Sequence, residues 1–401
     1  MDLFLYKVKN DTGRTLVGVL EAKNIKEVKR LFQIQDHFFL SAQTYDRNNL
    51  ARIQLKLDDL VMFNQRLSYL IDAGVPILQS LRTLWKQSEH PDVQIVVSYI
   101  YENLEHGGTL REAFGAFPKA FSPMYLALIS VAEVGAGLSN ILKKLSQYLE
   151  DQKKFYSRMK RATMYPLFVL GFALMVLLGL FVFVVPTFEK VITKLHSELP
   201  ILTQILFGFS NLIRNPIVLL VLILVIILTI ILWKYFSKVE AVKYRIDYWK
   251  LKMPLFKDIL YPLSVGRFTR SLSLLISSGV PLLTSVEVAQ STIVNKWLQK
   301  AVDEIRQFIL EGGSLYEAFK ATKVFPLIVV EMVGIGEAGG KLQKLLENVS
   351  THLEEEADYA LNKFLTFIEP ILIIFVGGIV LLVLLGIYLP IFSLQNVLRT
   401  M

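Results

Sequence analysis

Three long apolar runs constrain this chain more than any other feature. Residues 162–185 carry no charged side chain, and at about 1.5 Å per helical residue they can cross a hydrocarbon layer of roughly 30 Å. Residues 217–233 form a second run, at the lower length limit for a span, and residues 371–392 form a third. The hydrophobic content of 53% agrees with part of the chain lying in lipid. We therefore expect a mainly α-helical, polytopic membrane protein with three transmembrane helices.

Basic residues gather on one side of these runs and predict the orientation. They precede the first run and follow the second: Lys153, Lys154, Arg158, Lys160, Arg161, Lys234, Lys238, Lys243, Arg245, Lys250 and Lys252. Because Lys and Arg are retained on the cytoplasmic side, we expect a cytoplasmic N-terminus and a periplasmic C-terminus. The same flanks explain most of the net charge of +8 and predict attraction to anionic membrane lipids. We expect no nucleic-acid partner.

The sequence also contains an internal repeat. FNQRLSYLIDAGVPILQS at 63–80 matches FTRSLSLLISSGVPLLTS at 268–285, and GGTLREAF at 107–114 matches GGSLYEAF at 312–319. Each copy ends in an apolar run. If the soluble parts of both copies lie on one side of a membrane, one extra crossing must join them, and the short middle run supplies it.

Within a copy, the helical spacing of apolar residues predicts six helices, the third of them at 91–105 in the first copy. Thr109, with Glu112 three residues later, predicts a capping box at the start of the fourth helix. Gly74 ends the first helix and Pro76 opens the second, as Gly279 and Pro281 do in the second copy. The first residues instead alternate in polarity around NDTG, which predicts a small ββαβ appendage. The expected domains are a ββαβ region (1–57), a cytoplasmic six-helix bundle (58–160), a transmembrane helix (161–187), a periplasmic loop (188–215), a second transmembrane helix (216–234), a cytoplasmic linker (235–262), a second bundle (263–365), a third transmembrane helix (366–392) and a periplasmic tail (393–401).

The segment VGIGEAGGKL at 333–342 raises the question of a nucleotide site, because it contains GxGxxG and then Gly-Lys. A dinucleotide site requires a strand before the glycines within a βαβ unit, and a phosphate loop requires Ser or Thr after Gly-Lys, where this chain has Leu342. Neither context is present, so we expect no nucleotide or other cofactor.

The first copy retains only part of this segment. At an offset of 204, Glu133 and Gly135 align with Glu337 and Gly339. A single glycine after a helix suits a left-handed C-terminal cap. We therefore expect the segment to be a helix-to-helix turn.

Together these motifs resemble the type II secretion system protein F family. AGVP or SGVP follows an amphipathic helix, GGxLxEAF comes next, and GExxGxL-like turns lead to spans that begin at Tyr-Pro or Glu-Pro. Nearly the whole chain is covered, and the first copy departs modestly, with Ala132 before Glu133 and Ala136-Gly137 after Gly135. This family includes the platform proteins of type IV pilus assembly.

The resemblance implies a non-catalytic platform in the bacterial inner membrane. Its implied partners are a cytoplasmic assembly or retraction ATPase, pilin or pseudopilin subunits, other inner-membrane assembly proteins and further copies of the same chain. It leaves open whether the fibre serves secretion, adhesion, twitching or DNA uptake. It also suggests that the two Glu-x-Gly turns lie near a functional surface, although pure capping explains them equally well. The candidate structural or partner-contact residues are Gly74, Pro76, Glu133, Gly135, Gly279, Pro281, Glu337, Gly339, Glu369 and Pro370.

Other residues leave alternatives open. Ionisable groups inside spans mark carriers, and Glu369 at the mouth of the third span keeps a membrane transporter or permease as the alternative function. The acidic run at 354–358 could hold a divalent cation or form a solvated helix face. The span glycines could allow close helix contact or mark kinks; they are Gly171, Gly179, Gly377, Gly378 and Gly386. The chain has no cysteine, which excludes disulfides and thiolate metal sites. The five histidines lie far apart in the sequence, so we expect no metal site built from them.

Overall fold

The computed structural model describes residues 2–9, 13–34, 38–193, 200–236 and 239–400. It divides into two units, each built from segments far apart in the sequence. The first, called the bundle unit below, comprises residues 1–157 and 260–355. The second, called the membrane unit, comprises residues 158–259 and 356–401.

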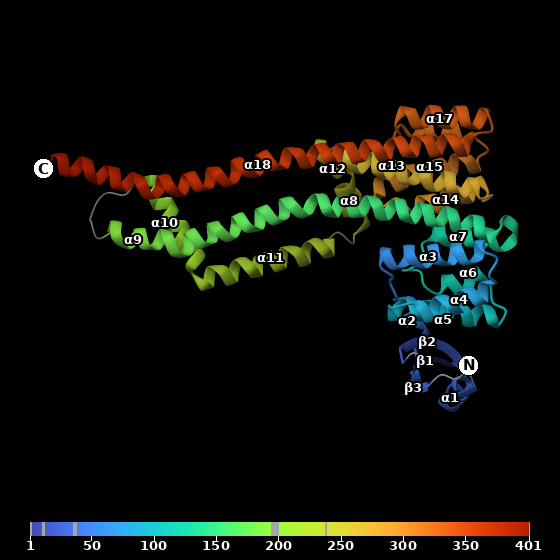
Figure 1. Ribbon diagram of the computed structural model, residues 1–401. Helices are drawn as coiled ribbons and strands as arrows, with labels where there is room; N and C mark the ends of the chain where they lie inside the picture. Colours follow the sequence, from blue (N-terminus) through green and yellow to red (C-terminus); the bar gives the residue numbers. More distant parts are fainter. Residues whose placement is uncertain (1, 10–12, 35–37, 194–199, 237–238, 401) are drawn as a thin grey trace. The chain divides into compact units, whose positions relative to one another are not determined.

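The N-terminal part of the bundle unit is a three-stranded antiparallel sheet with one helix (Figure 1). Its elements are β1 (Asp2–Lys9), β2 (Thr15–Ala22), α1 (Ile25–Ile34) and β3 (Phe38–Thr44), and the strand order is β2-β1-β3. Phe4, Tyr6 and Val8 of β1 are buried, as expected for one face of a strand that packs on a core. The predicted ββαβ order is confirmed. Of the predicted NDTG turn, only Gly13 lies within the described residues.

The first bundle follows after the short helix α2 (Arg47–Leu50). Its helices are α3 (Leu57–Asp72), α4 (Ile77–Gln87), α5 (Pro91–Glu105), α6 (Leu110–Gly115), α7 (Pro123–Val131) and the first part of α8 (Leu138–Gly179). The predicted capping box of Thr109 and Glu112 is present at the start of α6. Phe63, Phe114 and Phe121 form the centre of the core, with ring centroids 4.7 to 6.3 Å apart.

The second bundle repeats this order. Its helices are α13 (Pro254–Ser277), α14 (Leu282–Gln290), α15 (Lys296–Leu310), α16 (Leu315–Thr322), α17 (Leu327–Ala338) and the first part of α18 (Leu342–Thr400). Phe268, Phe319 and Phe325, the repeat equivalents of the first three phenylalanines, have ring centroids 4.7 to 6.2 Å apart. The duplication in the sequence is therefore a duplication of the core.

The two bundles contact each other within the bundle unit. The Nζ of Lys144 on α8 donates hydrogen bonds to the carbonyl oxygen of Ser277, at 2.8 Å, and to the Ser277 hydroxyl, at 3.1 Å. The Arg267 guanidinium lies over the rings of Phe155 and Tyr156. Partial burial lowers the pKa of Lys144, although the nearby Glu347 carboxylate opposes this.

The membrane unit contains the apolar helices. It comprises the rest of α8 and α18 together with π-helix η2 (Leu180–Val184), α9 (Val185–Thr193), α10 (Ile201–Arg214), α11 (Pro216–Phe236) and α12 (Glu240–Lys252). Among the described residues, three helical stretches are long and apolar enough to cross a membrane, which confirms the predicted number: Leu138–Ile192, Pro216–Tyr235 and Leu342–Leu389. None of the most apolar window of α11 is buried, so its side chains are free to face lipid.

One end of the membrane unit has its own apolar core. Helix α10, which lies in the predicted periplasmic loop, packs there with α9 and α18. The Thr203 hydroxyl donates to the carbonyl oxygen of Gly386 at 2.8 Å, and a Cβ at Gly386 would lie 3.0 Å from Leu206. Gly386 therefore allows a close helix contact. A Cβ added at any of the other four span glycines would meet no neighbouring atom within 4 Å, so the structure gives no such role to them.

Candidate functional site

The Gly-Val-Pro motifs connect the first two helices of each bundle. Gly74 and Gly279 have φ angles of 81° and 88°, so glycine is the residue that fits there without strain. The carbonyl oxygens near the ends of α3 and α13 accept bonds from the next amides, and Pro76 and Pro281 are the N-cap residues of α4 and α14. These four candidate residues form two equivalent helix connections in the described structure, and contact with a partner at these positions stays a prediction.

The two repeated glutamates cap a neighbouring helix. Glu133 Oε1 accepts a hydrogen bond from the amide of Leu110 at 2.8 Å, at the start of α6. Glu337 accepts two such bonds at the start of α16, from Leu315 at 2.8 Å and from Tyr316 at 2.9 Å. The first amides of a helix have no partner within the helix, and a carboxylate there also interacts favourably with the helix dipole.

Sequence reasoning missed this long-range role. The available signal was the recurrence of the glutamate at a nearly fixed distance after GGTL and GGSL. The recurrence predicts a contact between the glutamate and GGTL or GGSL only if α7 or α17 packs back against the preceding helix. The sequence alone does not give that packing.

The prediction that Gly135 and Gly339 form left-handed caps is wrong. Gly339 has a φ of −93°, and Gly135 has a φ of 161°, which is extended backbone. The positive φ angles lie further along, at Gly137 and Gly340, with values of 76° and 64°. The chain continues past the glutamate before it turns, by a π-helix η1 (Ala132–Ala136) in the first copy.

The GxGxxG segment is also more helical than predicted. Gly334 and Gly336 lie inside α17 rather than in a turn, and no strand leads into them. A Cβ at Gly336 would lie 2.8 Å from the Cα of Leu342 in α18, and one at Gly334 would lie 2.7 Å from the Tyr316 ring. Both glycines therefore serve close packing between helices.

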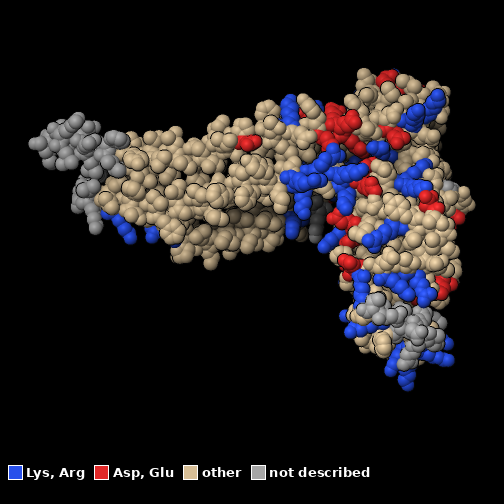
Figure 2. Space-filling view, viewed as in Figure 1, with Lys and Arg blue, Asp and Glu red and all other residues tan. Residues whose placement is uncertain are grey.

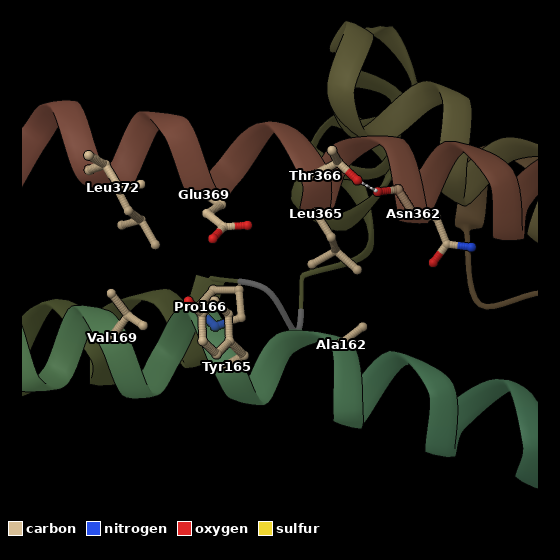
Figure 3. A pocket seen from close by; sticks show the side chains of 10 residues that line it. Ala162, Tyr165, Pro166, Val169, Asn362, Leu365, Thr366, Glu369 and Leu372 are labelled. Atoms are coloured by element: carbon tan, nitrogen blue, oxygen red, sulfur yellow. Dashed lines mark hydrogen bonds between the residues drawn. The ribbon is translucent and has the colours of Figure 1, made fainter.

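The membrane unit holds a pocket between α8 and α18, with a volume of about 360 Å³ (Figure 3). The candidate residue Glu369 lines it and points toward α8, where Tyr165 and Pro166 lie opposite. Pro370 follows Glu369 directly on α18 but is not a lining residue. The complete lining is Ala162, Tyr165, Pro166, Val169, Asn362, Leu365, Thr366, Glu369, Leu372 and Ile373.

Charged side chains are rare along the apolar parts of the helices in the membrane unit and are frequent next to those parts (Figure 2). Arg158 and Asp358 form an ion pair of 2.5 Å, just before the apolar parts of α8 and α18. In the bundle unit, Glu354 accepts a hydrogen bond from Arg270 at 3.1 Å. Two members of the predicted acidic run thus have cationic partners. Among the described residues, no group of three metal-ligating side chains is placed to hold a metal ion.

The N-terminal sheet is attached to the first bundle through the edge of β2. The amide of Val17 donates to Gln94 Oε1 at 2.8 Å, and the amide of Val19 donates to the Ser98 hydroxyl at 2.9 Å. The indole of Trp85 donates to the Val17 carbonyl at 2.7 Å. An unpaired strand edge is a template for unwanted pairing, and here side chains of α4 and α5 cover it. The sequence signal was two polar residues, four apart, within the otherwise apolar stretch 93–100 of α5.

A second cavity, of about 410 Å³, lies beside this contact. Its lining includes Glu21 of β2 and Glu102, Glu105 and His106 at the end of α5. Burial, assisted by the Glu105 charge, raises the pKa of Glu102 to about 7, although His106 opposes the shift. A hydrogen bond to the Glu102 carbonyl raises the pKa of His106.

Comparison with known proteins gives a consistent result. The family profile of type II secretion system (T2SS), protein F, matches residues 63–186 and 268–390, which are the two repeats. The type IV pilus assembly protein PilC of Myxococcus xanthus is 32% identical over 99% of this chain and 96% of its own length. PilC of Thermus thermophilus is 30% identical over 98% of both chains. The type II secretion system protein F of Vibrio cholerae is 26% identical over 99% of both chains.

The two matched segments are the two repeats, whose core phenylalanines occupy equivalent positions. The similarity extends over nearly the full length of the relatives, so it includes the apolar helices as well as both bundles. This chain therefore belongs to the type II secretion system protein F family.

Proposed function

We propose that this protein is a non-catalytic platform of the bacterial inner membrane that couples a cytoplasmic ATPase to the insertion or removal of pilin or pseudopilin subunits. The observation that carries the proposal is the architecture of the two repeats: each begins as a water-soluble bundle and ends in an apolar helix that forms one continuous element with it. Relatives of this construction are named type IV pilus assembly proteins and type II secretion system proteins. In this proposal the bundles bind the ATPase and other assembly proteins, and the apolar helices contact the fibre subunits and further copies of the chain.

The orientation in the membrane is part of the proposal. The basic residues near the ends of the apolar helices favour cytoplasmic bundles, with the N-terminus in the cytoplasm and the C-terminus in the periplasm. This places the bundles where they can meet an ATPase that hydrolyses cytoplasmic ATP.

The test uses the full chain in two settings. In cells of the source bacterium, deletion of the gene should abolish surface or periplasmic fibres while the cellular amounts of ATPase and pilin stay unchanged, because a platform is needed for assembly and not for synthesis. In lipid nanodiscs, the purified chain should bind the hexameric secretion ATPase of the same bacterium and change its hydrolysis rate. Normal fibres in the deletion strain would overturn the proposal, as would the lack of any interaction with the ATPase.

A transporter is the second candidate, and the pocket with Glu369 is the observation that favours it. A carrier would lose solute uptake into membrane vesicles when Glu369 is changed to Gln. A platform would show no uptake of its own to lose.

A further inference from the structure

We infer that the pocket between α8 and α18 binds the N-terminal end of an apolar helix from a membrane partner, with the Glu369 carboxylate as the counter-ion of its protonated amine. This inference rests on the proposed function, which supplies the partner: a subunit inserted in the membrane. All residues that line the pocket belong to the membrane unit.

The pocket is built from equivalent segments of the two repeats. At the offset of 204, four pairs of lining or adjacent residues correspond: Ala162 and Thr366, Tyr165 and Glu369, Pro166 and Pro370, and Val169 and Ile373. The α8 side and the α18 side of the pocket are thus built from nearly the same positions of the repeat. The pair of Tyr165 and Glu369 breaks that symmetry by adding a negative charge on one side.

The two prolines leave hydrogen-bond acceptors without helical donors. Proline has no backbone N–H, so the carbonyl four residues earlier loses its partner in the helix. Those carbonyls belong to Ala162, before Pro166, and to Thr366, before Pro370, and both residues line the pocket. Each such carbonyl needs another donor. The pocket therefore offers two backbone acceptors beside the side-chain groups of Tyr165, Asn362 and Thr366.

Glu369 adds a charged acceptor to the pocket. It is the one charged residue of the lining, which contains no Lys, Arg or His. Its side chain points across the pocket toward Tyr165 and Pro166 (Figure 3). A carboxylate in a span is costly without a counter-ion, and the structure describes no cation among the lining residues.

The size and walls of the pocket select the occupant. Its volume of about 360 Å³ is far larger than a single ion needs, and Val169, Leu365 and Leu372 form apolar walls that an ion would leave unused. A phospholipid would bring a phosphate group, for which the lining offers no cationic partner. The N-terminal end of an apolar helix brings an apolar body, an ammonium group and amides that have no partner within their own helix. Its positive dipole end also favours a nearby carboxylate.

The experiment uses the full chain in nanodiscs of phosphatidylcholine. The probe is a synthetic 20-residue Leu/Ala helix with a photoreactive leucine at its third position, made with either a free or an acetylated N-terminus. We expect the free amine to cross-link to the pocket segments of the unmodified chain about tenfold more than the acetylated helix, which corresponds to about 1.4 kcal/mol. Mass spectrometry of the peptides that contain residues 162–169 and 362–373 gives the site.

Two variants and one lipid control make the test specific. Glu369→Gln should reduce cross-linking of the free amine to the level of the acetylated helix. Glu356→Gln, an exposed position on α18 outside the pocket, should leave it unchanged. Equal cross-linking of both helices to the unmodified chain would overturn the inference, as would loss of the preference for the free amine in discs that contain phosphatidylethanolamine, which would identify a lipid amine as the occupant.

The two proposals fail separately. If the amine preference is absent while the chain still binds the ATPase and supports fibres, the pocket assignment is wrong and the platform function stands. If cross-linking succeeds but fibres form without this protein, the platform function is wrong.

Discussion

Glu133 and Glu337 occupy equivalent positions yet make different numbers of hydrogen bonds. Glu337 follows an uninterrupted α-helical turn and reaches two amides of α16, whereas Glu133 lies in the π-helical turn η1 and reaches one amide of α6. The two copies therefore differ in this turn: the first forms the π-helix η1 after α7, whereas the second continues α17 as far as Ala338.

Removal of these caps should therefore affect the second bundle more. Glu337→Ala should increase amide hydrogen exchange in α16 about tenfold, because charge-assisted bonds contribute about 1.5 kcal/mol even at the lower end that suits an exposed carboxylate. Glu133→Ala should produce a smaller increase in α6. Glu331→Ala, on the exposed side of α17, is the matched control. If exchange in α16 were unchanged in Glu337→Ala, the cap would have no energetic role.

At the scale of elements, much of the bundle follows from local sequence. The spacing of apolar residues predicts α5 at 91–105, where the structure has Pro91–Glu105, and the Thr109 capping box begins α6 as predicted. The prediction failed where a choice depends on tertiary contacts. The residue with a positive φ angle is Gly340 and not Gly339, because α17 continues to a point where Gly336 packs against Leu342. Local helix propensity contains no information about that contact.

The candidate site was predictable only in part. Glu369 was identifiable as an ionisable residue at the mouth of a span. Its position opposite Tyr165 and Pro166 was not, because it depends on how α8 and α18 lie side by side in the membrane unit. The hydrogen bonds between β2 and the side chains of Gln94 and Ser98 were not predictable for the same reason, because they join residues more than 70 positions apart in the sequence.

The contact between the sheet and α5 should weaken as pH rises. The pKa of Glu102 is raised from 4.5 to about 7, so the folded state favours the protonated carboxyl. The stabilisation is fully present below about pH 4.5 and is lost as pH rises through about 7, with a total of roughly 3 kcal/mol at 1.36 kcal/mol per pH unit. His106, whose pKa is also raised, loses its contribution in the same direction.

Glu102→Gln should remove most of this dependence. At pH 8, amide exchange in β2 should be at least tenfold slower in the variant than in the unmodified chain, and the ratio should approach one near pH 5. Taking the ratio at each pH cancels the intrinsic pH dependence of exchange. Glu89→Gln, an exposed position before α5, is the control. A constant ratio across this range would contradict the assignment.

At the scale of the whole molecule, the repeats predict a fixed topology. Two copies with bundles on one side of a membrane need α11 as the return crossing. The absence of cysteine from the sequence makes the topology directly measurable, since single cysteines can be introduced one at a time.

A membrane-impermeant maleimide applied to intact spheroplasts should label Leu212→Cys in α10 and should not label Lys119→Cys or Glu311→Cys until the cells are lysed. All three positions are exposed within their units, and the cysteine-free chain gives the background. Labelling of either bundle position from outside would refute the orientation, whereas failure to label Leu212→Cys before lysis would refute the assignment of α10 to the periplasm.

The edge of β2 makes the two repeats unequal despite their matching cores. Gln94, Ser98 and Trp85 of the first copy correspond to Gln299, Asp303 and Gln290 of the second, so the second copy lacks both the indole and the hydroxyl that hold the strand. A chimera in which the second bundle replaced the first would keep a glutamine for the Val17 amide but would leave the Val19 amide and the Val17 carbonyl without their side-chain partners. The matching cores would thus tolerate an exchange of individual core residues between the copies, whereas an exchange of whole bundles would remove hydrogen bonds that hold the N-terminal sheet.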